Sequence, residues 1–136
     1  MTHLQMMYYG LIPYLITIAA GFFGIHATVA VKTLLFLHSV NLLNWVCGYH
    51  WTMSMQSIQV QTKIACSLLS ILSLWATYTY IDGQQQMALY LMITLYLFQL
   101  YGDFRSDITY AISPHFKLAR ILSTALIVYS LLRVLQ

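Results

Sequence analysis

Long apolar stretches with almost no charged side chains dominate this sequence of 136 residues. Only 7% of the residues are Asp, Glu, Lys or Arg, whereas about a quarter are charged in an ordinary soluble domain. So few charges cannot cover a water-facing surface of this size, and the mean hydropathy of +0.73 agrees. Lipid is therefore the expected solvent. The six Lys and Arg residues are scattered and form no patch, which argues against nucleic-acid binding.

Five apolar segments approach or reach the length of a membrane-spanning helix, which needs roughly 20 residues. Polar stretches separate them, and the clearest turn is IDGQQQ, with Asp82-Gly83 at its centre. We therefore predict an all-α fold, a polytopic integral membrane helical bundle that forms a single transmembrane domain over residues 1–136. The expected spans are 6–23, 29–53, 64–80, 87–101 and 116–135, with polar loops at 54–61 and 102–115.

Five spans place the two chain termini on opposite sides of the membrane. The side that holds the N-terminus then carries four of the six basic residues, Lys63, Arg105, Lys117 and Arg120. Basic residues favour the cytoplasmic side, so an N-in, C-out orientation is expected. The N-terminal segment lacks the basic residues of a signal or transit peptide. This favours the bacterial cell inner membrane, and the mitochondrial inner membrane is the alternative.

The second expected span contains polar side chains that lipid cannot satisfy. At about 100° per residue, His38 shares one stripe with Asn41, and Asn44 shares a neighbouring stripe with Trp51. These stripes are expected to face other helices, either for interhelical hydrogen bonding or as a ligand or ion site. His38 and His50 cannot share one haem, because they lie roughly 18 Å apart along one helix.

A second polar cluster follows the fourth span, where Asp103 and Asp107 flank Arg105. The topology brings this loop to the same side as His50 and Arg120, so a loop carboxylate is expected to tie those two residues together across three helices. An ordinary solvated loop and a site for an anionic lipid headgroup are the other interpretations. No convincing pair of nucleophile and base is present, so no catalytic residue, metal site or cofactor is predicted.

The sequence also predicts the surroundings of the two cysteines and of two tyrosines within the fourth span. Cys47 and Cys66 lie in apolar runs, outside any CxxC or zinc spacing, and are expected to be buried thiols rather than a disulfide. Tyr90 and Tyr96 fall inside the fourth span, so their hydroxyl groups are expected to find partners within the protein.

Several short motifs occur in an order that resembles a known family. They are GLIPYL in the first span, Gly48-Tyr49-His50-Trp51, Gly102-Asp103-Phe104-Arg105, and Leu118-Ala119-Arg120 in the last span. In this order they resemble the transmembrane protein 69-like family, also described as domain of unknown function 3429. The resemblance implies a small five-span protein of bacterial inner membranes or mitochondria, with no established activity. Cys47 and Thr52 stand where the family pattern has glycines.

Two classes of function remain. The first is a non-catalytic accessory or assembly subunit of a larger membrane complex, for which a respiratory-chain complex is the commonest host. The expected partners are then the lipid bilayer and other integral membrane subunits, since the polar stripes need partners and no soluble domain is expected. The alternative is a lipid-, quinone- or haem-binding membrane protein, in which aromatic residues near Trp51, together with Arg105 and Arg120, frame a headgroup.

Overall fold

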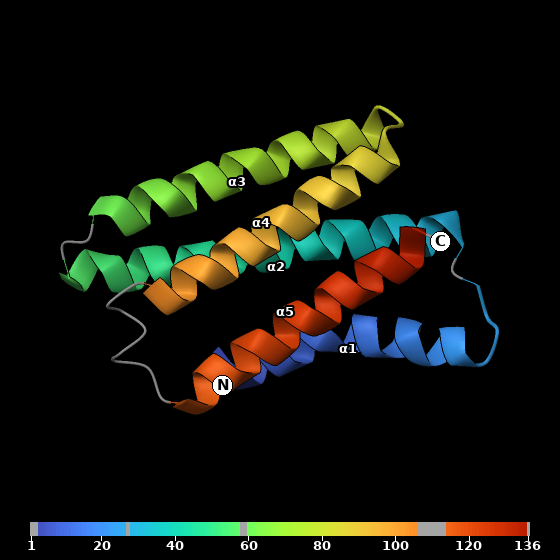
Figure 1. The fold of residues 1–136 in the computed structure, drawn as a ribbon, viewed down its shortest axis with the longest axis horizontal. Helices are drawn as coiled ribbons and strands as arrows, with labels where there is room; N and C mark the ends of the chain where they lie inside the picture. The colour runs from blue at the N-terminus through green and yellow to red at the C-terminus, as the bar shows by residue number, and fades with distance from the viewer. Residues whose placement is uncertain (1–2, 27, 58–59, 106–113, 136) are drawn as a thin grey trace.

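The structure, a computed structural model, describes residues 3–26, 28–57, 60–105 and 114–135. Within these residues the chain forms five α-helices and no strand, which confirms the all-helical fold class. The helices are α1 (His3–Phe22), α2 (Val29–Ser57), α3 (Val60–Ile81), α4 (Gln85–Arg105) and α5 (Pro114–Leu135). They alternate in direction along the long axis of the molecule, so the two ends of the described chain lie at opposite ends of the bundle (Figure 1).

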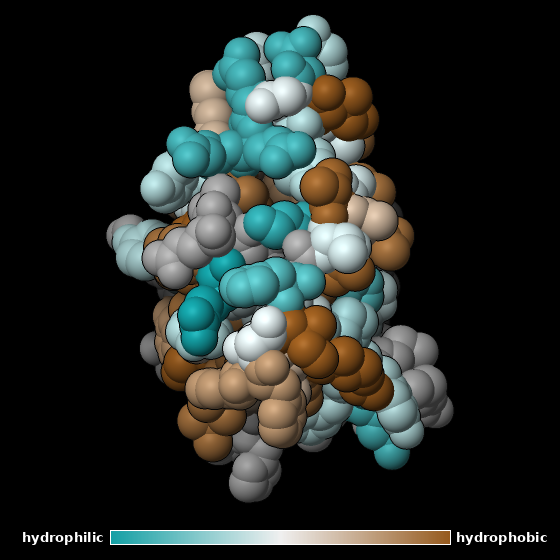
Figure 2. Space-filling model, turned by 90° about the vertical axis from the view of Figure 1, so that its right-hand side faces the viewer, coloured by the Kyte–Doolittle hydropathy of each residue, from teal (hydrophilic) through white to brown (hydrophobic). Residues whose placement is uncertain are grey.

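Three of the described helices contain stretches long and apolar enough to cross a membrane: Val29–Trp51 of α2, Val60–Ile81 of α3 and Gln85–Phe104 of α4. At about 1.5 Å per residue, each stretch is close to the roughly 30 Å thickness of the hydrocarbon core. Tyr8–Phe22 of α1 is a shorter apolar stretch. Figure 2 looks onto the end of the bundle that holds the α3–α4 connection, and hydrophilic groups gather at the top and middle of this face. This arrangement is compatible with a membrane protein.

Glycine and proline mark several helix ends, including the end of α3 at the predicted IDGQQQ turn. In IDGQQQ, α3 ends at Ile81 and Gly83 adopts a φ of 90°, which residues with a side chain disfavour. Gly24, with a φ of 72°, lies between α1 and α2. Pro114 is the first residue of α5, a position where the missing N–H breaks no helical hydrogen bond.

Two expected loops are partly helical in the structure. α2 continues to Ser57 and α3 begins at Val60, so most of the 54–61 segment is helix. α4 continues through Gly102 to Arg105, which places Asp103 in the helix and not in the loop after it. The reason is that a helix can extend beyond its apolar stretch when Ser, Gln and Met follow, and a single glycine costs only about 1 kcal/mol.

The described helices pack so that much of one face of α2 has no neighbouring helix among them. α3 lies along both α2 and α4, and α5 packs against α4 and α1, while α1 makes only a small contact with α2. Phe36 of α2 stacks on Tyr80 of α3 with ring centroids 4.2 Å apart, and Met92 of α4 is fully buried in the same core. Cys47 and Cys66 are buried free thiols, as the sequence predicts.

Candidate functional site

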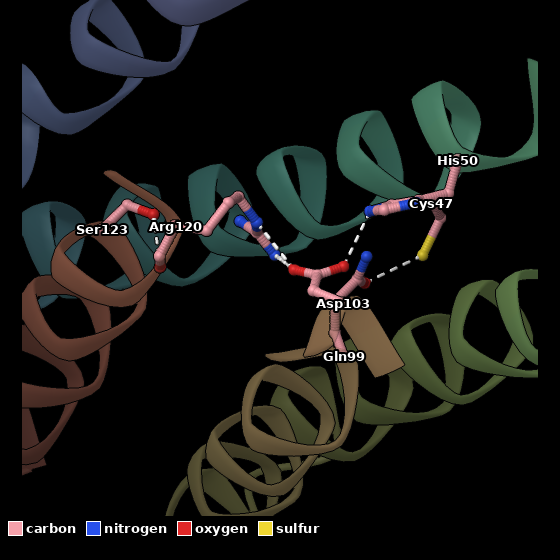
Figure 3. A network of polar contacts seen from close by, with 6 residues as sticks. All are labelled: Cys47, His50, Gln99, Asp103, Arg120 and Ser123. Atoms are coloured by element: carbon pink, nitrogen blue, oxygen red, sulfur yellow. Dashed lines mark hydrogen bonds and ion pairs between the residues drawn. The ribbon is translucent and has the colours of Figure 1, made fainter. Parts of the chain in front are cut away.

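A buried acidic residue lies between two basic ones where α2 and α4 end and α5 begins (Figure 3). Oδ1 of Asp103, in the last turn of α4, lies 2.7 Å from Nε2 of His50 on α2. Oδ2 accepts a 2.8 Å hydrogen bond from Nε of Arg120 on α5, and Nη2 of Arg120 lies 2.8 Å from the same oxygen. We name His50, Asp103 and Arg120 the ionic cluster.

The ionic cluster is almost closed to solvent, since the exposed fractions are 3% for His50, 5% for Asp103 and 3% for Arg120. An isolated charge buried in this way would be very costly, and opposite charges in contact offset that cost. The Arg120 Nε bond is well aligned. His50 Nε2 and Arg120 Nη2 lie 2.7 Å and 2.8 Å from the carboxylate oxygens. The cluster therefore joins three helices through the Asp103 carboxylate.

The structure brings together three of the eight site residues named from the sequence. The carboxylate that meets His50 and Arg120 belongs to Asp103, which lies in α4 and not in a loop. Asp107 and the side chain of Arg105 lie outside the described residues. Trp51 follows His50 directly but is 38% exposed, unlike the three buried residues of the cluster.

A further contact between α2 and α4 lies next to the ionic cluster (Figure 3). Sγ of Cys47 donates to Oε1 of Gln99 at 3.2 Å, and both residues are buried. Cys47 precedes His50 by three positions and Gln99 precedes Asp103 by four, so each pair shares one helix face. A partly open cavity of about 70 Å³ borders His50, Gln99 and Asp103. It is large enough to hold water beside the carboxylate.

Ser39 is the centre of a second buried polar group, which was not identified from the sequence. Its Oγ donates to the carbonyl of Leu35 at 2.8 Å, so the Tyr14 hydroxyl is the donor in the 2.7 Å contact with that Oγ. Tyr96 donates to the backbone carbonyl of Ser39 at 2.6 Å. These contacts join α1, α2 and α4. The mid-span position of Tyr96 was the available signal, but the same expectation was wrong for Tyr90, which is 60% exposed.

We expect Tyr96→Phe to lower the free energy of unfolding by about 1 kcal/mol, because it removes a buried interhelical hydrogen bond and keeps the ring. Tyr90→Phe, on the exposed side of the same helix, is the matched control and should change it by less than about 0.5 kcal/mol. Unfolding of each purified variant in mixed micelles, followed by circular dichroism, measures both values. Equal effects would contradict a stabilising role for the Ser39 contacts.

Two polar side chains in the α2 stripes form hydrogen bonds to other helices, whereas Asn41 forms none with a described residue. Nε2 of His38 lies 2.8 Å from the Gly10 carbonyl on α1, and Nδ2 of Asn44 donates to Oγ of Ser73 on α3 at 3.1 Å. Both therefore face other helices, as expected. Asn41 is exposed and faces no other helix among the described residues, so the expectation stays untested for this residue. Helical periodicity defines which residues share a face, but α1 packs mainly on α5 and leaves that face of α2 uncovered.

Comparison with known protein families, with curated proteins and with solved structures finds no match for this chain. The resemblance to the transmembrane protein 69-like family therefore stays a prediction. Among the residues that the structure describes, no group of three or more His, Cys, Asp or Glu side chains is placed to hold a metal ion. The fold and the site together define an all-helical protein with three helices able to span a membrane and a buried ionic cluster at one end.

Proposed function

We propose that this chain is a five-span membrane protein that acts as a non-catalytic accessory or assembly subunit of a larger membrane complex. The observation that carries the proposal is the closed ionic cluster, in which both carboxylate oxygens of Asp103 are engaged by His50 and Arg120. A carboxylate held in this way stabilises the ends of three helices. It is poorly placed to take a proton from a substrate, because a general base must reach the group that it deprotonates.

The five-span arrangement is supported by the alternating direction of the helices and by the 22-residue length of α5, equal to that of α3. The proposed location is the bacterial cell inner membrane, with the mitochondrial inner membrane as the alternative. Arg120 is neutralised by Asp103, so the proposed N-in orientation depends on the other basic residues. Three of these five, Lys63, Arg105 and Lys117, belong to the N-terminal side.

Exposed aromatic side chains near the ionic cluster support contact with a partner subunit. Trp51 of α2 is 38% exposed, and Phe98, Tyr101 and Phe104 of α4 are 57%, 56% and 48% exposed. Trp and Tyr anchor helices at the membrane interface, and they also contribute strongly to protein–protein contacts. The proposed partners are other integral membrane subunits, with a respiratory-chain complex as the commonest host of such small chains.

Purification of the tagged chain from membranes in a mild detergent tests this function. The proposal predicts that one or more membrane proteins co-purify in fixed stoichiometry and stay associated during size exclusion. A small membrane protein with the same tag and expression level is the control for non-specific capture. Recovery of this chain by itself, as a monomer or as an assembly of identical copies, would contradict an accessory role.

A lipid- or quinone-binding protein is the second candidate, and a groove between α1 and α2 favours it. The groove has a volume of about 450 Å³ and a largely apolar lining that includes Pro13 and Ile16, which suits an acyl or isoprenoid chain. His38 also lines it. Because a carbonyl can only accept, His38 Nε2 donates to Gly10, which leaves Nδ1 as an acceptor for a hydroxyl group. Haem has less support, since Nε2 of His50 is also engaged.

Mass spectrometry of the lipids that remain with the purified protein tests the second candidate. One lipid or quinone enriched to a fixed ratio over the surrounding membrane would support it. A bound fraction with the same composition as the bulk membrane would contradict it, and an absorption spectrum without a Soret band would remove haem.

A further inference from the structure

Much of one face of α2 is left uncovered by the other described helices, and it has the spacing of a helix-packing seam. Its members recur at intervals of three and four residues: Leu34, Leu37, Asn41, Asn44, Gly48 and Trp51. This is the spacing with which two helices pack side by side. Leu34 is 66% exposed, and Asn41 and Gly48 are also exposed. We name these six residues the α2 seam.

Asn41 is the polar residue of the α2 seam that requires an explanation. It lies close to the middle of the apolar stretch Val29–Trp51, and its side chain is exposed. The polar neighbours His38 and Asn44 have partners on α1 and α3, whereas no described residue supplies a hydrogen bond to the Asn41 amide. An amide facing hydrocarbon is costly, so this side chain requires a partner that the described residues do not supply.

We propose that the α2 seam binds a second copy of this chain, with the two α2 helices packed in parallel. All copies insert into the membrane in the same orientation, so a two-fold axis along the membrane normal brings the two Asn41 side chains to the same depth. A carboxamide both donates and accepts hydrogen bonds, so the two side chains complement each other. A different protein would need a polar group at this depth, and a second copy has one.

Gly48 and the flanking grooves allow the two helices to approach closely. Gly48 lies seven residues after Asn41 on the α2 seam, and a Cβ added there would meet no described atom within 4 Å. Small residues at such positions let membrane helices pack backbone to backbone. A groove of about 450 Å³ lies on the α1 side of the seam, and one of about 390 Å³ lies on the α3 side. These grooves have room for side chains from the second copy.

The contact between copies goes beyond the accessory role and does not depend on it, because the α2 seam excludes the ionic cluster and shares only Trp51 with the exposed aromatic residues near it. A dimer of this chain can exist with or without other subunits. The experiment therefore measures association between identical copies in a bilayer that contains no other protein.

Two fluorescently tagged populations of the full chain, mixed in phosphatidylcholine vesicles over a range of lipid-to-protein ratios, report the dimer by energy transfer. We expect a specific dimer for the natural sequence. Asn41→Leu should weaken it roughly tenfold, because the interhelical hydrogen bonds are lost. Gly48→Leu should weaken it more than tenfold, since it adds bulk to the contact at a position where an added Cβ meets no described atom of the single chain. Gly21→Leu, another open position, on α1, is the matched control and should not change it.

Each outcome separates this inference from the accessory role. Energy transfer at the level of random mixing, or equal dimerisation of all variants, would overturn the dimer. Loss of a co-purifying subunit in Asn41→Leu, without any dimer in vesicles, would assign the α2 seam to that subunit. The accessory role would then stand and the dimer would not. A dimer that weakens as expected in a chain that co-purifies with nothing else would support the inference and contradict the accessory role.

Discussion

Asp103→Asn should lower the free energy of unfolding by about 3–5 kcal/mol, the usual cost of removing one partner from a buried ion pair. The substitution keeps the size of the side chain and removes the negative charge that lies 2.8 Å from Arg120. The guanidinium group then stays buried, at 3% exposure, without a counter-charge. The cavity beside the carboxylate, of about 70 Å³, has room for little water, so solvent should compensate for little of the loss.

Asp82→Asn is the matched control for Asp103→Asn, because Asp82 is exposed in the turn between α3 and α4. It should change the free energy of unfolding by less than about 0.5 kcal/mol. Unfolding in mixed micelles measures both variants, and the amount of folded protein in the membrane fraction gives a second measure. Similar values for the two substitutions would mean that the Asp103 carboxylate does not hold the helix ends together.

Arg120→Met is expected to have the second largest effect, a loss on the order of 3 kcal/mol. Methionine replaces the apolar stem of the arginine side chain but removes the positive charge that lies 2.8 Å from the Asp103 carboxylate. Arg133→Met is the control, since Arg133 lies in the last turn of the same helix and is exposed. Its 3.2 Å contact with Tyr129 is at the surface and should contribute little.

A double-mutant cycle shows whether His50 and Arg120 act through the same carboxylate. His50→Leu and Arg120→Met should each destabilise the protein, and the double variant should lose less than the sum of the two. The coupling free energy should fall between about 0.5 and 3 kcal/mol, as for residues that share one network. Strict additivity of the two losses would contradict a shared cluster.

The five-span topology predicted that a carboxylate contacts both His50 and Arg120. The direction of each span determines which helix ends lie on the same side of the membrane. The sequence did not show that Asp103 was the residue involved or that it lies in a helix. Three ionisable residues follow one another at alternate positions from Asp103 to Asp107, and spacing alone does not define where the helix ends. The helical turn at Asp103 is consistent with the paired contacts that its carboxylate makes there.

The Ser39 contacts and the exposure of Asn41 could not be predicted from the sequence, for a different reason. A hydroxyl group in an apolar helix can bond to its own backbone, as Ser39 does with Leu35, so its presence does not indicate a partner helix. Asn41 shares a helical stripe with His38, but His38 is half-buried and Asn41 is exposed. One part of the stripe packs against a neighbouring helix, and the other part extends beyond that contact. Only the packing of α1 on α5 decides which part is covered.

The variant His50→Leu/Asp103→Leu/Arg120→Met tests most directly whether the ionic cluster is structural. Well-packed apolar side chains often replace a buried ionic group at little or no cost to stability. We therefore predict that this triple variant regains most of the stability lost in Asp103→Asn and co-purifies with the same membrane subunits as the natural sequence. A triple variant that folds stably but loses those subunits, or that remains as unstable as Asp103→Asn, would contradict a purely structural cluster.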